Sequence, residues 1–386
     1  MVSSESSVSA VRHVDFIVIG AGMAGASVAW WLAPHARVVI LERESQPGYH
    51  TTGRSAAVYL EAYGSAQVRA LTLASRDFFL HPPPGFAEHP LMTRRGALMV
   101  AAPGQEADLA AHVAVLTQLG LRHDRLTPAQ ACEMVPVLHP DRVTDAVHEP
   151  DACDLDVHGI HQGFLKGVRQ HGGQVVCQAP VHGLTHDGHG WQVTTPAGHW
   201  RAPVVLNAAG AWADQLGQQA GAAPIGLQPC RRAAFTFAPT PGLSVDHWPM
   251  TYSAGEDWYF KPDAGLLLAS PANADPTEPQ DVQPEEWDIA LGIHRIEEAT
   301  TLRIRRPAHT WAGLRSFVAD KSLVGGFDTR APGFFWVAGQ GGYGIQTAPA
   351  MGEACAALAR HLPLPDHLRR RGLTADMLSP ARLQQG

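Results

Sequence analysis

The chain has few cysteines and keeps them far apart. Only five occur in 386 residues, at Cys132, Cys153, Cys177, Cys230 and Cys355, and none forms a C-x-x-C pair. This spacing argues against a zinc knot, an iron–sulfur cluster or a disulfide framework. A reducing compartment, the cytoplasm, is the expected location.

Positive charge is also scarce. The chain has 29 Lys and Arg against 36 Asp and Glu, a formal net charge of −7. No basic stripe is available to displace counterions from nucleic acid, so we expect no nucleic-acid partner. The histidines at His182, His186 and His189 surround an Asp187-Gly188 turn without a carboxylate at ligand spacing, and no metal site is expected there.

The beginning of the chain lacks the pattern of a secretion signal. Residues 1–12, "MVSSESSVSAVR", are polar, with no basic start followed by an apolar core, and are predicted to be a disordered tail. Residues 16–34 carry no charge, and by length alone could suggest a membrane span. A glycine motif gives a better account of them, so no transmembrane segment is expected.

The chain contains a complete nucleotide-binding pattern near its start. An apolar strand, Phe16 to Ile19, precedes three glycines in G-x-G-x-x-G spacing, an Ala-rich helix to about Leu32, and a second strand from Val38 to Leu41 that ends in Glu42. The glycines Gly20, Gly22 and Gly25 serve a tight turn, a close approach to pyrophosphate and helix packing, respectively. The helix N-terminus would face the phosphates, and Glu42 the ribose hydroxyls.

A second glycine-rich loop lies more than 300 residues later. The apolar strand Phe334 to Val337 enters a loop containing Gly339, Gly341, Gly342 and Gly344, and a helix follows to about His361. Two such loops suit one long cofactor, and FAD fits this arrangement better than NAD.

The remaining segments suggest two interleaved domains. From Gly173 to Asn207, short strands and turns predict an antiparallel meander that feeds a buried strand, and 220–320 contains alternating strands and an acidic helix. The predicted fold class is α/β, with a Rossmann-like FAD-binding domain (13–60, 146–219 and 321–386) interleaved with an antiparallel-sheet substrate domain (61–145 and 220–320).

Five separated blocks resemble a known family. The opening motif with Glu42, "HTTGRSAA" (50–57), "LNAAGAWAD" (206–214), "HTWAGLRSF" (309–317) and "GQGGYGIQTAPAMGEA" (339–354) are similar to FAD-dependent amine oxidoreductases of the D-amino acid oxidase superfamily. Within it the likeness is closest to bacterial D-arginine dehydrogenases, and it covers nearly the whole chain. No cysteine follows Arg315, where related covalent flavoproteins carry one, so the resemblance implies noncovalent FAD.

The resemblance implies a set of FAD-binding residues drawn from both glycine loops and the segments between them. They are Gly20, Gly22, Met23, Ala24, Gly25, Glu42, Arg43, Thr52, Gly53, Arg54, Ser55, Ala56, Val181, Gly210, Gly339, Gly341, Gly342, Tyr343, Gly344 and Ile345.

The resemblance also implies a clamp for the carboxylate of an amino acid. Arg232 and Arg315 would grip it as planar forks, helped by the hydroxyls of Tyr63 and Tyr259, while the Gly342 carbonyl would accept from the amine. Arg231, beside Arg232, leaves the register of that strand open. The substrate would be oriented for hydride transfer from Cα to flavin N5, and the resulting imino acid would hydrolyse to a 2-oxo acid and ammonia.

Departures from D-arginine dehydrogenase concern the side-chain pocket. Where that enzyme has a carboxylate for the guanidinium, this chain has Ala97, and two polar loop positions are Val58 and Leu60. Met250, Tyr252 and Gln346 complete the predicted pocket. We therefore expect apolar or aromatic side chains to be preferred over basic ones, because a buried guanidinium needs its counter-charge. Val58 and Leu60 could equally serve only to pack the domain interface.

The sequence thus predicts an FAD-dependent D-amino acid dehydrogenase that passes electrons to an unidentified acceptor. An oxygen-using oxidase and an oxidoreductase for sarcosine or other N-alkyl amino acids use the same clamp and stay open. A flavin-binding electron-transfer protein without amine chemistry is the alternative from a different class.

Overall fold

The computed structural model describes residues 11–384. Most of the predicted tail, residues 1–10, lies outside this range. Arg12 does not, and it forms the short strand β1 (Arg12–His13), which pairs in parallel with β13 (Gly198–Ala202). The guanidinium of Arg12 lies 5.2 Å from the centre of the Trp200 ring. The tail prediction is therefore wrong at Arg12, where pairing and cation–π contact order the chain.

A six-stranded sheet forms the nucleotide-binding half. Its order is β10 (Gln174–Val176), β3 (Val38–Leu41), β2 (Phe16–Ile19), β14 (Val204–Asn207), β22 (Phe334–Ala338) and β21 (Val324–Phe327). All of these pairs are parallel except β21 with β22. The four central strands are buried along their whole length and are apolar except for Asn207 at the end of β14, as expected for a sheet that is covered on both faces.

Helices cover one face of this sheet and a small sheet covers the other. On the first face, α1 (Met23–Leu32), α5 (Val157–Gln170), α8 (Ala348–Ala359) and α2 (Ala66–Leu80) share one core with the strands. On the second, β13, β12 (Trp191–Thr195) and β11 (Gly183–His186) pack with α6 (Ala213–Gln219). The predicted meander begins too early, because β10 pairs in parallel with β3 and only β11 to β13 are antiparallel.

A nine-stranded sheet forms the second half. Along it lie β19 (Asp275–Pro276), β15 (Gln228–Phe237), β18 (Leu266–Ser270), β17 (Tyr259–Asp263), β16 (Met250–Ser253), β6 (Ala97–Ala101), β8 (Asp145–Glu149) and β7 (Asp124–Leu126), while β20 (His309–Phe317) pairs with β15. On one face pack α4 (Pro128–Met134) and α7 (Glu286–Ala299), and on the other α3 (Glu106–Gln118).

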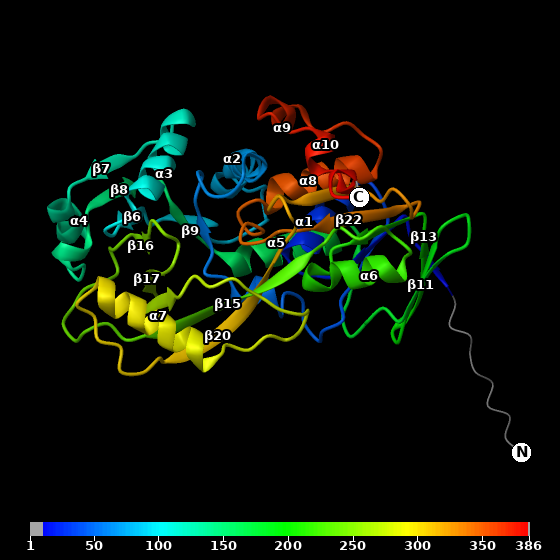
Figure 1. Cartoon of the computed structure of the whole chain (residues 1–386). Helices are drawn as coiled ribbons and strands as arrows, with labels where there is room; N and C mark the ends of the chain where they lie inside the picture. The colour runs from blue at the N-terminus through cyan, green and yellow to red at the C-terminus, as the bar shows by residue number, and fades with distance from the viewer. Residues whose placement is uncertain (1–10, 385–386) are drawn as a thin grey trace, which may run out of the picture.

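Smaller elements complete the fold. A three-stranded sheet joins β4 (Val58–Tyr59), β9 (Cys153–Leu155) and β5 (Met92–Arg94), and the short helices α9 (Asp366–Arg370) and α10 (Ala375–Leu378) follow α8. Figure 1 shows the nine-stranded sheet with α3, α4 and α7 on the left and the nucleotide-binding half on the right, with β15 and β20 reaching from one to the other.

Two predicted domain boundaries differ from the packing. β8 belongs to the nine-stranded sheet because it pairs with β6, so the 145/146 boundary lies too early. α2, predicted as part of the substrate domain, packs against α8 through Val68, Leu71 and Phe79. The apolar face of α2 packs against the nucleotide-binding core. The position of α2 in the sequence could not predict this contact.

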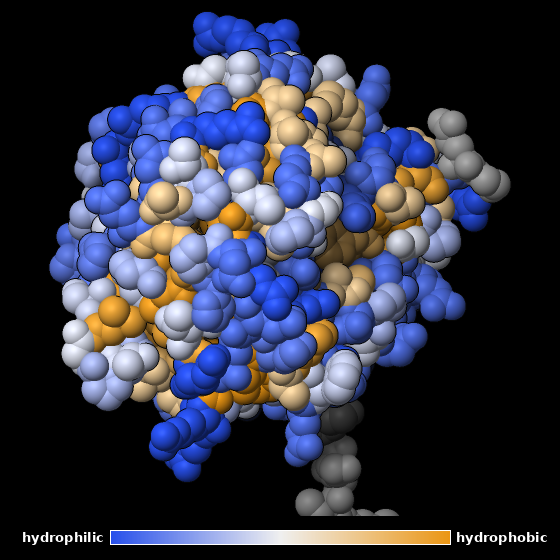
Figure 2. Space-filling model, turned by 60° about the vertical axis from the view of Figure 1, so that its left-hand side comes forward, coloured by the Kyte–Doolittle hydropathy of each residue, from blue (hydrophilic) through white to orange (hydrophobic). Residues whose placement is uncertain are grey.

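The surface is mainly polar. Figure 2 shows a face on which hydrophilic residues predominate and hydrophobic ones form small groups. In the range 11–384, no helix is both long enough and apolar enough to cross a bilayer.

Candidate active site

A deep cavity of about 570 Å³ runs between the two glycine loops and ends at the nine-stranded sheet. Sixteen of the predicted FAD-binding residues line it, drawn from segments far apart in the chain. They are Gly20, Gly22, Met23, Ala24, Glu42, Arg43, Thr52, Arg54, Ser55, Ala56, Val181, Gly210, Gly341, Gly342, Gly344 and Ile345.

The first glycine loop has the geometry that its spacing predicts. Gly20 has φ +102°, and a Cβ there would lie 2.4 Å from the Ala208 carbonyl oxygen. A Cβ at Gly25 would lie 1.9 Å from the Gly20 oxygen, so this glycine serves helix packing and does not line the cavity. At Gly22 the nearest atom, Thr52 Oγ1, would be 3.3 Å away. The backbone at Gly22 is therefore open to a close ligand.

Glu42 lies at the end of β3 where the ribose is expected. Its side chain is buried, and its two oxygens accept backbone hydrogen bonds from Ala21 (2.8 Å) and Glu44 (3.0 Å). Each oxygen keeps a lone pair for a further donor, such as a ribose hydroxyl. Beside it the Arg43 guanidinium lies 4.6 Å from the Trp212 ring centre, and both residues line the cavity.

The "HTTGRSAA" loop forms a 3₁₀ turn, Thr51–Arg54, that is joined to the substrate half. Arg54 donates to the carbonyls of Val282 (3.0 Å) and Ala312 (3.1 Å) and forms an ion pair with Asp281. Thr51 donates to the Leu314 carbonyl at 2.7 Å. These bonds fix the loop along one wall of the cavity. Gly53 does not line it, because it faces Gly48 inside the turn.

Two cavity residues outside the predicted set have buried nitrogens that lack a hydrogen-bond partner among the described residues. These atoms are Nδ1 of His50, whose nearest acidic oxygen is Asp281 Oδ1 at 3.9 Å, and Nε2 of Gln340. Both residues lie within predicted motifs, "HTTGRSAA" and "GQGGYG", so their position beside glycine and hydroxyl residues was the available signal. A buried polar atom without a partner is costly, so both nitrogens indicate a polar ligand.

These features fit FAD. The cavity is long, and both of its glycine loops bring backbone to its wall. Glu42 lies at the position expected for the ribose, and two buried nitrogens lack a hydrogen-bond partner among the described residues.

Two arginines face the far end of the cavity from paired strands. Arg232 of β15 lies opposite Gly313 of β20, and Arg315 lies opposite Cys230. Because residues two apart on a strand share a face, both guanidinium groups come from the same side of the sheet. Tyr259 also lines this end, as does Gly342. A Cβ at Gly342 would lie 2.9 Å from Arg315 Nη1, so the glycine backbone lies directly over the guanidinium.

Tyrosine hydroxyls, and no acids, accompany the two arginines. Tyr63 and Tyr259 are neighbours of the two arginines and favour their charged forms. Burial and the neighbouring charge of Arg315 lower the pKa of Arg232 to about 10. Burial also opposes the charge of Arg315, but Tyr63, Tyr259 and Tyr343 together outweigh it and its pKa is raised. Within residues 11–384, neither arginine has an ion pair with a carboxylate. Two desolvated cations without a counter-charge form an anion site.

Strand register distinguishes Arg232 from Arg231. Arg231 points to the opposite face, where its guanidinium contacts Asp288 (2.7 Å) and Glu285. The side chain of Arg232 donates only to the carbonyl of Asn273 and lines the cavity. Arg231 is thus an ordinary ion-pair residue.

The predicted side-chain pocket does not open onto the cavity. Val58, Leu60, Ala97, Met250 and Tyr252 pack in one apolar cluster with Tyr63, and none of the six lines the cavity. Ala97 and Leu60 are 0% and 9% exposed and pack within this cluster, and their role in a side-chain pocket stays a prediction.

Gln346 was also predicted to line the pocket, but it does not line the cavity. Its amide is buried and bonded to the backbone of Leu60 and to Thr72. Two other predicted FAD residues, Gly339 and Tyr343, stay outside the cavity. Tyr343 packs its ring on Tyr63, with centres 5.0 Å apart, and Gly339 supplies a turn with φ +73°.

Comparisons with known proteins agree with this geometry. The family model described as "DAO: FAD dependent oxidoreductase" matches residues 15–358. Glycine oxidase of Geobacillus kaustophilus is 24% identical over 90% of this chain and 93% of its own, and its crystal structure superposes with a TM-score of 0.77 at 22% identity, covering 91% of this chain and 96% of that one. L-proline dehydrogenase from P. horikoshii superposes with a TM-score of 0.78 at 19% identity, covering 98% and 99%.

Some relatives are much longer. Rat mitochondrial dimethylglycine dehydrogenase is 24% identical over 54% of this chain, which spans only 25% of that protein. Since the family model covers most of residues 11–384 and the cavity fits its cofactor, the chain belongs to the DAO family of FAD-dependent oxidoreductases.

Proposed function

We propose that the chain is a dehydrogenase that oxidises D-amino acids at the Cα–N bond and uses noncovalent FAD. The observation that carries the proposal is the pair Arg232 and Arg315, which line the end of the cofactor cavity with Tyr259 and have no carboxylate ion pair within residues 11–384. Tyr63, outside the cavity lining, is a neighbour of Arg315. A carboxylate bound there would neutralise two buried cations and accept several hydrogen bonds at once.

The residues of the clamp would orient the substrate. When bound, FAD supplies the acceptor for the hydride. The two guanidinium groups would hold the carboxylate, and the Gly342 carbonyl, which lies over Arg315, would accept a hydrogen bond from the amine. With these two ends fixed, one Cα–H bond is aimed at the cofactor, and orientation of this kind accounts for much of the rate. The imino acid would then hydrolyse in water to the 2-oxo acid and ammonia.

The apolar cluster around Tyr252 supports a preference for apolar over basic side chains. Glu149, which pairs with Ala97 in register, accepts from the Tyr252 hydroxyl (3.0 Å) and bonds His112 (2.8 Å), both at Oε1. A substrate guanidinium would have to compete with Tyr252 and His112 for this carboxylate. The special likeness to D-arginine dehydrogenase stays a prediction.

A second candidate is glycine or an N-alkyl glycine such as sarcosine. It is favoured by the burial of Leu60 and Ala97, which leaves little room for a side chain, and by the similarity to glycine oxidase and dimethylglycine dehydrogenase. Use of oxygen as the electron acceptor belongs to the same candidate, and an electron-transfer role without amine chemistry is the remaining alternative.

Anaerobic titration of the FAD-loaded protein tests these candidates. We expect bleaching of the flavin band by D-leucine or D-phenylalanine and little by their L-enantiomers or by D-arginine. Bleaching by glycine and sarcosine alone would establish the second candidate. If no amino acid bleaches the flavin band, an electron-transfer role without amine chemistry is the remaining candidate. Peroxide release in air separates an oxidase from a dehydrogenase.

A further inference from the structure

Gln346 holds the backbone of Leu60 from both sides. Its Oε1 accepts from Leu60 N at 3.1 Å, and its Nε2 donates to Leu60 O at 3.3 Å and to Thr72 Oγ1 at 2.9 Å. The side chain is 3% exposed. Both amide protons and the amide oxygen are thus used within the protein.

The hydrogen bonds between Gln346 and Leu60 close a circuit of interactions that includes Tyr63 and Arg315 of the carboxylate clamp. Leu60 O also accepts from Tyr63 N (3.4 Å), and the Tyr63 ring packs on Tyr343 of the second glycine loop, with centres 5.0 Å apart. Tyr63 also offsets the effect of burial on Arg315 and helps to raise its pKa. Arg315 lies under Gly342, which is only four residues before Gln346. These interactions therefore link the second glycine loop to Arg315, Tyr63 and Leu60, and Gln346 links Leu60 back to the same glycine loop. Moving any member shifts the Tyr63 hydroxyl relative to Arg315.

We propose that Gln346 is a positioning residue that sets the Tyr63 hydroxyl against Arg315 and thereby sets the affinity of the site for the substrate carboxylate. This inference rests on the proposed carboxylate clamp. Without the Gln346 amide, the middle of the 58–64 loop loses its side-chain anchor, and Leu60 N loses its acceptor inside the protein, while β4 keeps its strand pairing. A displacement of about 1 Å in a positioning group is enough to weaken binding or rate strongly.

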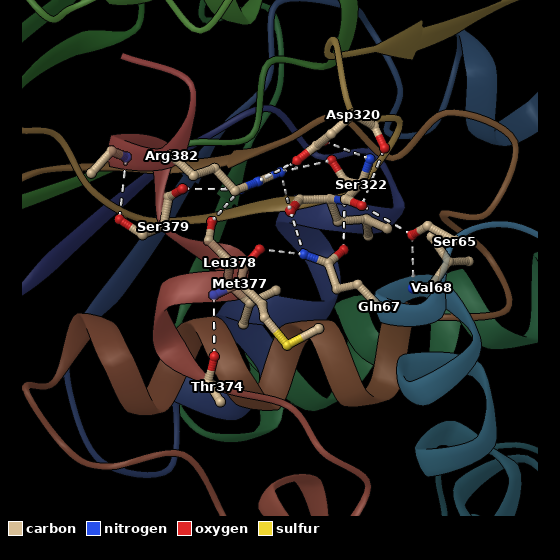
Figure 3. A network of polar contacts seen from close by, with 12 residues as sticks. Ser65, Gln67, Val68, Asp320, Ser322, Thr374, Met377, Leu378, Ser379 and Arg382 are labelled. Carbon is tan, nitrogen blue, oxygen red and sulfur yellow. Dashed lines mark hydrogen bonds and ion pairs between the residues drawn. The ribbon is translucent and has the colours of Figure 1, made fainter. Parts of the chain in front are cut away.

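The far end of the same loop has an anchor of the same chemistry. Gln67, at the start of α2, accepts from Leu323 N (2.7 Å) and donates to the Leu323 carbonyl (3.0 Å). It also donates to the carbonyl of Met377 (2.6 Å), as Figure 3 shows. Ser65, the N-cap of α2, bonds Ser322 at 3.0 Å. Gln67 is as buried as Gln346, but its hydrogen bonds are to Leu323 and Met377 and do not connect it to Arg232 or Arg315. Gln67 is therefore a matched control.

The test compares Gln346→Leu with Gln67→Leu in the FAD-loaded protein. The readouts are the Kd for benzoate, taken from the change in flavin absorbance, the rate of anaerobic flavin reduction, the FAD content and the Tm. We expect both variants to lower Tm, but only Gln346→Leu to raise the benzoate Kd, by about tenfold, the effect of one misplaced hydrogen bond to a charged group. Gln346→Glu, which keeps the acceptor for Leu60 N, should recover part of the affinity.

A double variant decides whether Gln346 acts through Tyr63. In a Tyr63→Phe background, Gln346→Leu should raise the Kd no further, because the hydroxyl that it positions is gone. Equal Kd values for wild type and Gln346→Leu, equal effects of the two glutamine variants, or full additivity with Tyr63→Phe would each overturn the inference. If Gln346→Leu does not fold, Gln346→Glu and Thr72→Val take its place. Failure of the wild-type protein to bind any carboxylate would overturn the clamp itself, and the inference with it.

Discussion

Arg232 and Arg315 project from paired antiparallel strands into one end of the cofactor cavity, and no carboxylate within residues 11–384 forms an ion pair with either. Their like charges would repel without a ligand, and burial adds to this cost, which is why the pKa of Arg232 falls to about 10. An anion relieves both costs, so ligand binding and stability are linked at this site.

Replacing Arg315 by Lys should therefore weaken carboxylate binding. A lysine is a point charge and cannot supply the two parallel hydrogen bonds of a guanidinium. We expect the benzoate Kd to rise on the order of 100-fold, or about 3 kcal/mol. Flavin absorbance titration measures it. Arg231→Lys is the control, because Arg231 pairs with Asp288 and Glu285 on the other face. A comparable loss in both variants would contradict the clamp.

Asp281→Asn should speed the release of FAD. Asp281 forms an ion pair with Arg54, accepts from Tyr49 at 3.2 Å, and so ties the cofactor loop to the substrate half. Losing a hydrogen bond to a charged group weakens this tie, and we expect release to be severalfold faster. The rise of free flavin fluorescence on dilution follows it. Asp366→Asn, which removes an exposed pair with Arg369, should leave the release rate unchanged.

The two glycines Gly22 and Gly25 should respond differently to alanine. At Gly25 the new Cβ would meet the Gly20 carbonyl oxygen at 1.9 Å, so helix α1 must move, and we expect a loss of about 3 kcal/mol in unfolding free energy even without FAD. At Gly22 the only close atom is Thr52 Oγ1 at 3.3 Å. Gly22→Ala should fold normally and bind FAD weakly, because its methyl group occupies space meant for the ligand. Urea unfolding and FAD titration separate the two results, and similar unfolding losses would refute the distinction.

Glu61→Gln should stabilise the protein at neutral pH but not in acid. Burial, only partly offset by Arg76 at 3.1 Å, raises the pKa of Glu61 above its usual 4.5. A carboxyl group with a raised folded-state pKa adds stability below its unfolded pKa, and this is lost as the pH rises through the folded pKa. Thermal unfolding of both proteins between pH 4 and pH 8 should therefore show a gap that opens with pH. A variant less stable than wild type at pH 8 would mean that the Arg76 pair outweighs burial.

Local patterns predicted the nucleotide-binding elements closely. β2, β3 and α1 lie where the apolar runs and the glycine spacing put them, because buried parallel strands and a tight strand-to-helix turn leave a direct trace in adjacent residues. The family resemblance pointed to Arg232, Arg315 and Tyr63 before their contacts were visible, but it could not tell which of two adjacent arginines faces the cavity.

The sequence by itself determined the cofactor class, the FAD-dependent family and the chemistry-bearing residue types, since these depend on short motifs whose residues act together locally. Only the tertiary structure decided that β8 joins the larger sheet, that α2 packs on α8, that Leu60 and Ala97 pack in one apolar cluster, and that Gln346 bonds Leu60. Each of these depends on strand register or on contacts between segments distant in the chain, and a shift of one residue in register moves every side chain of a strand to the opposite face.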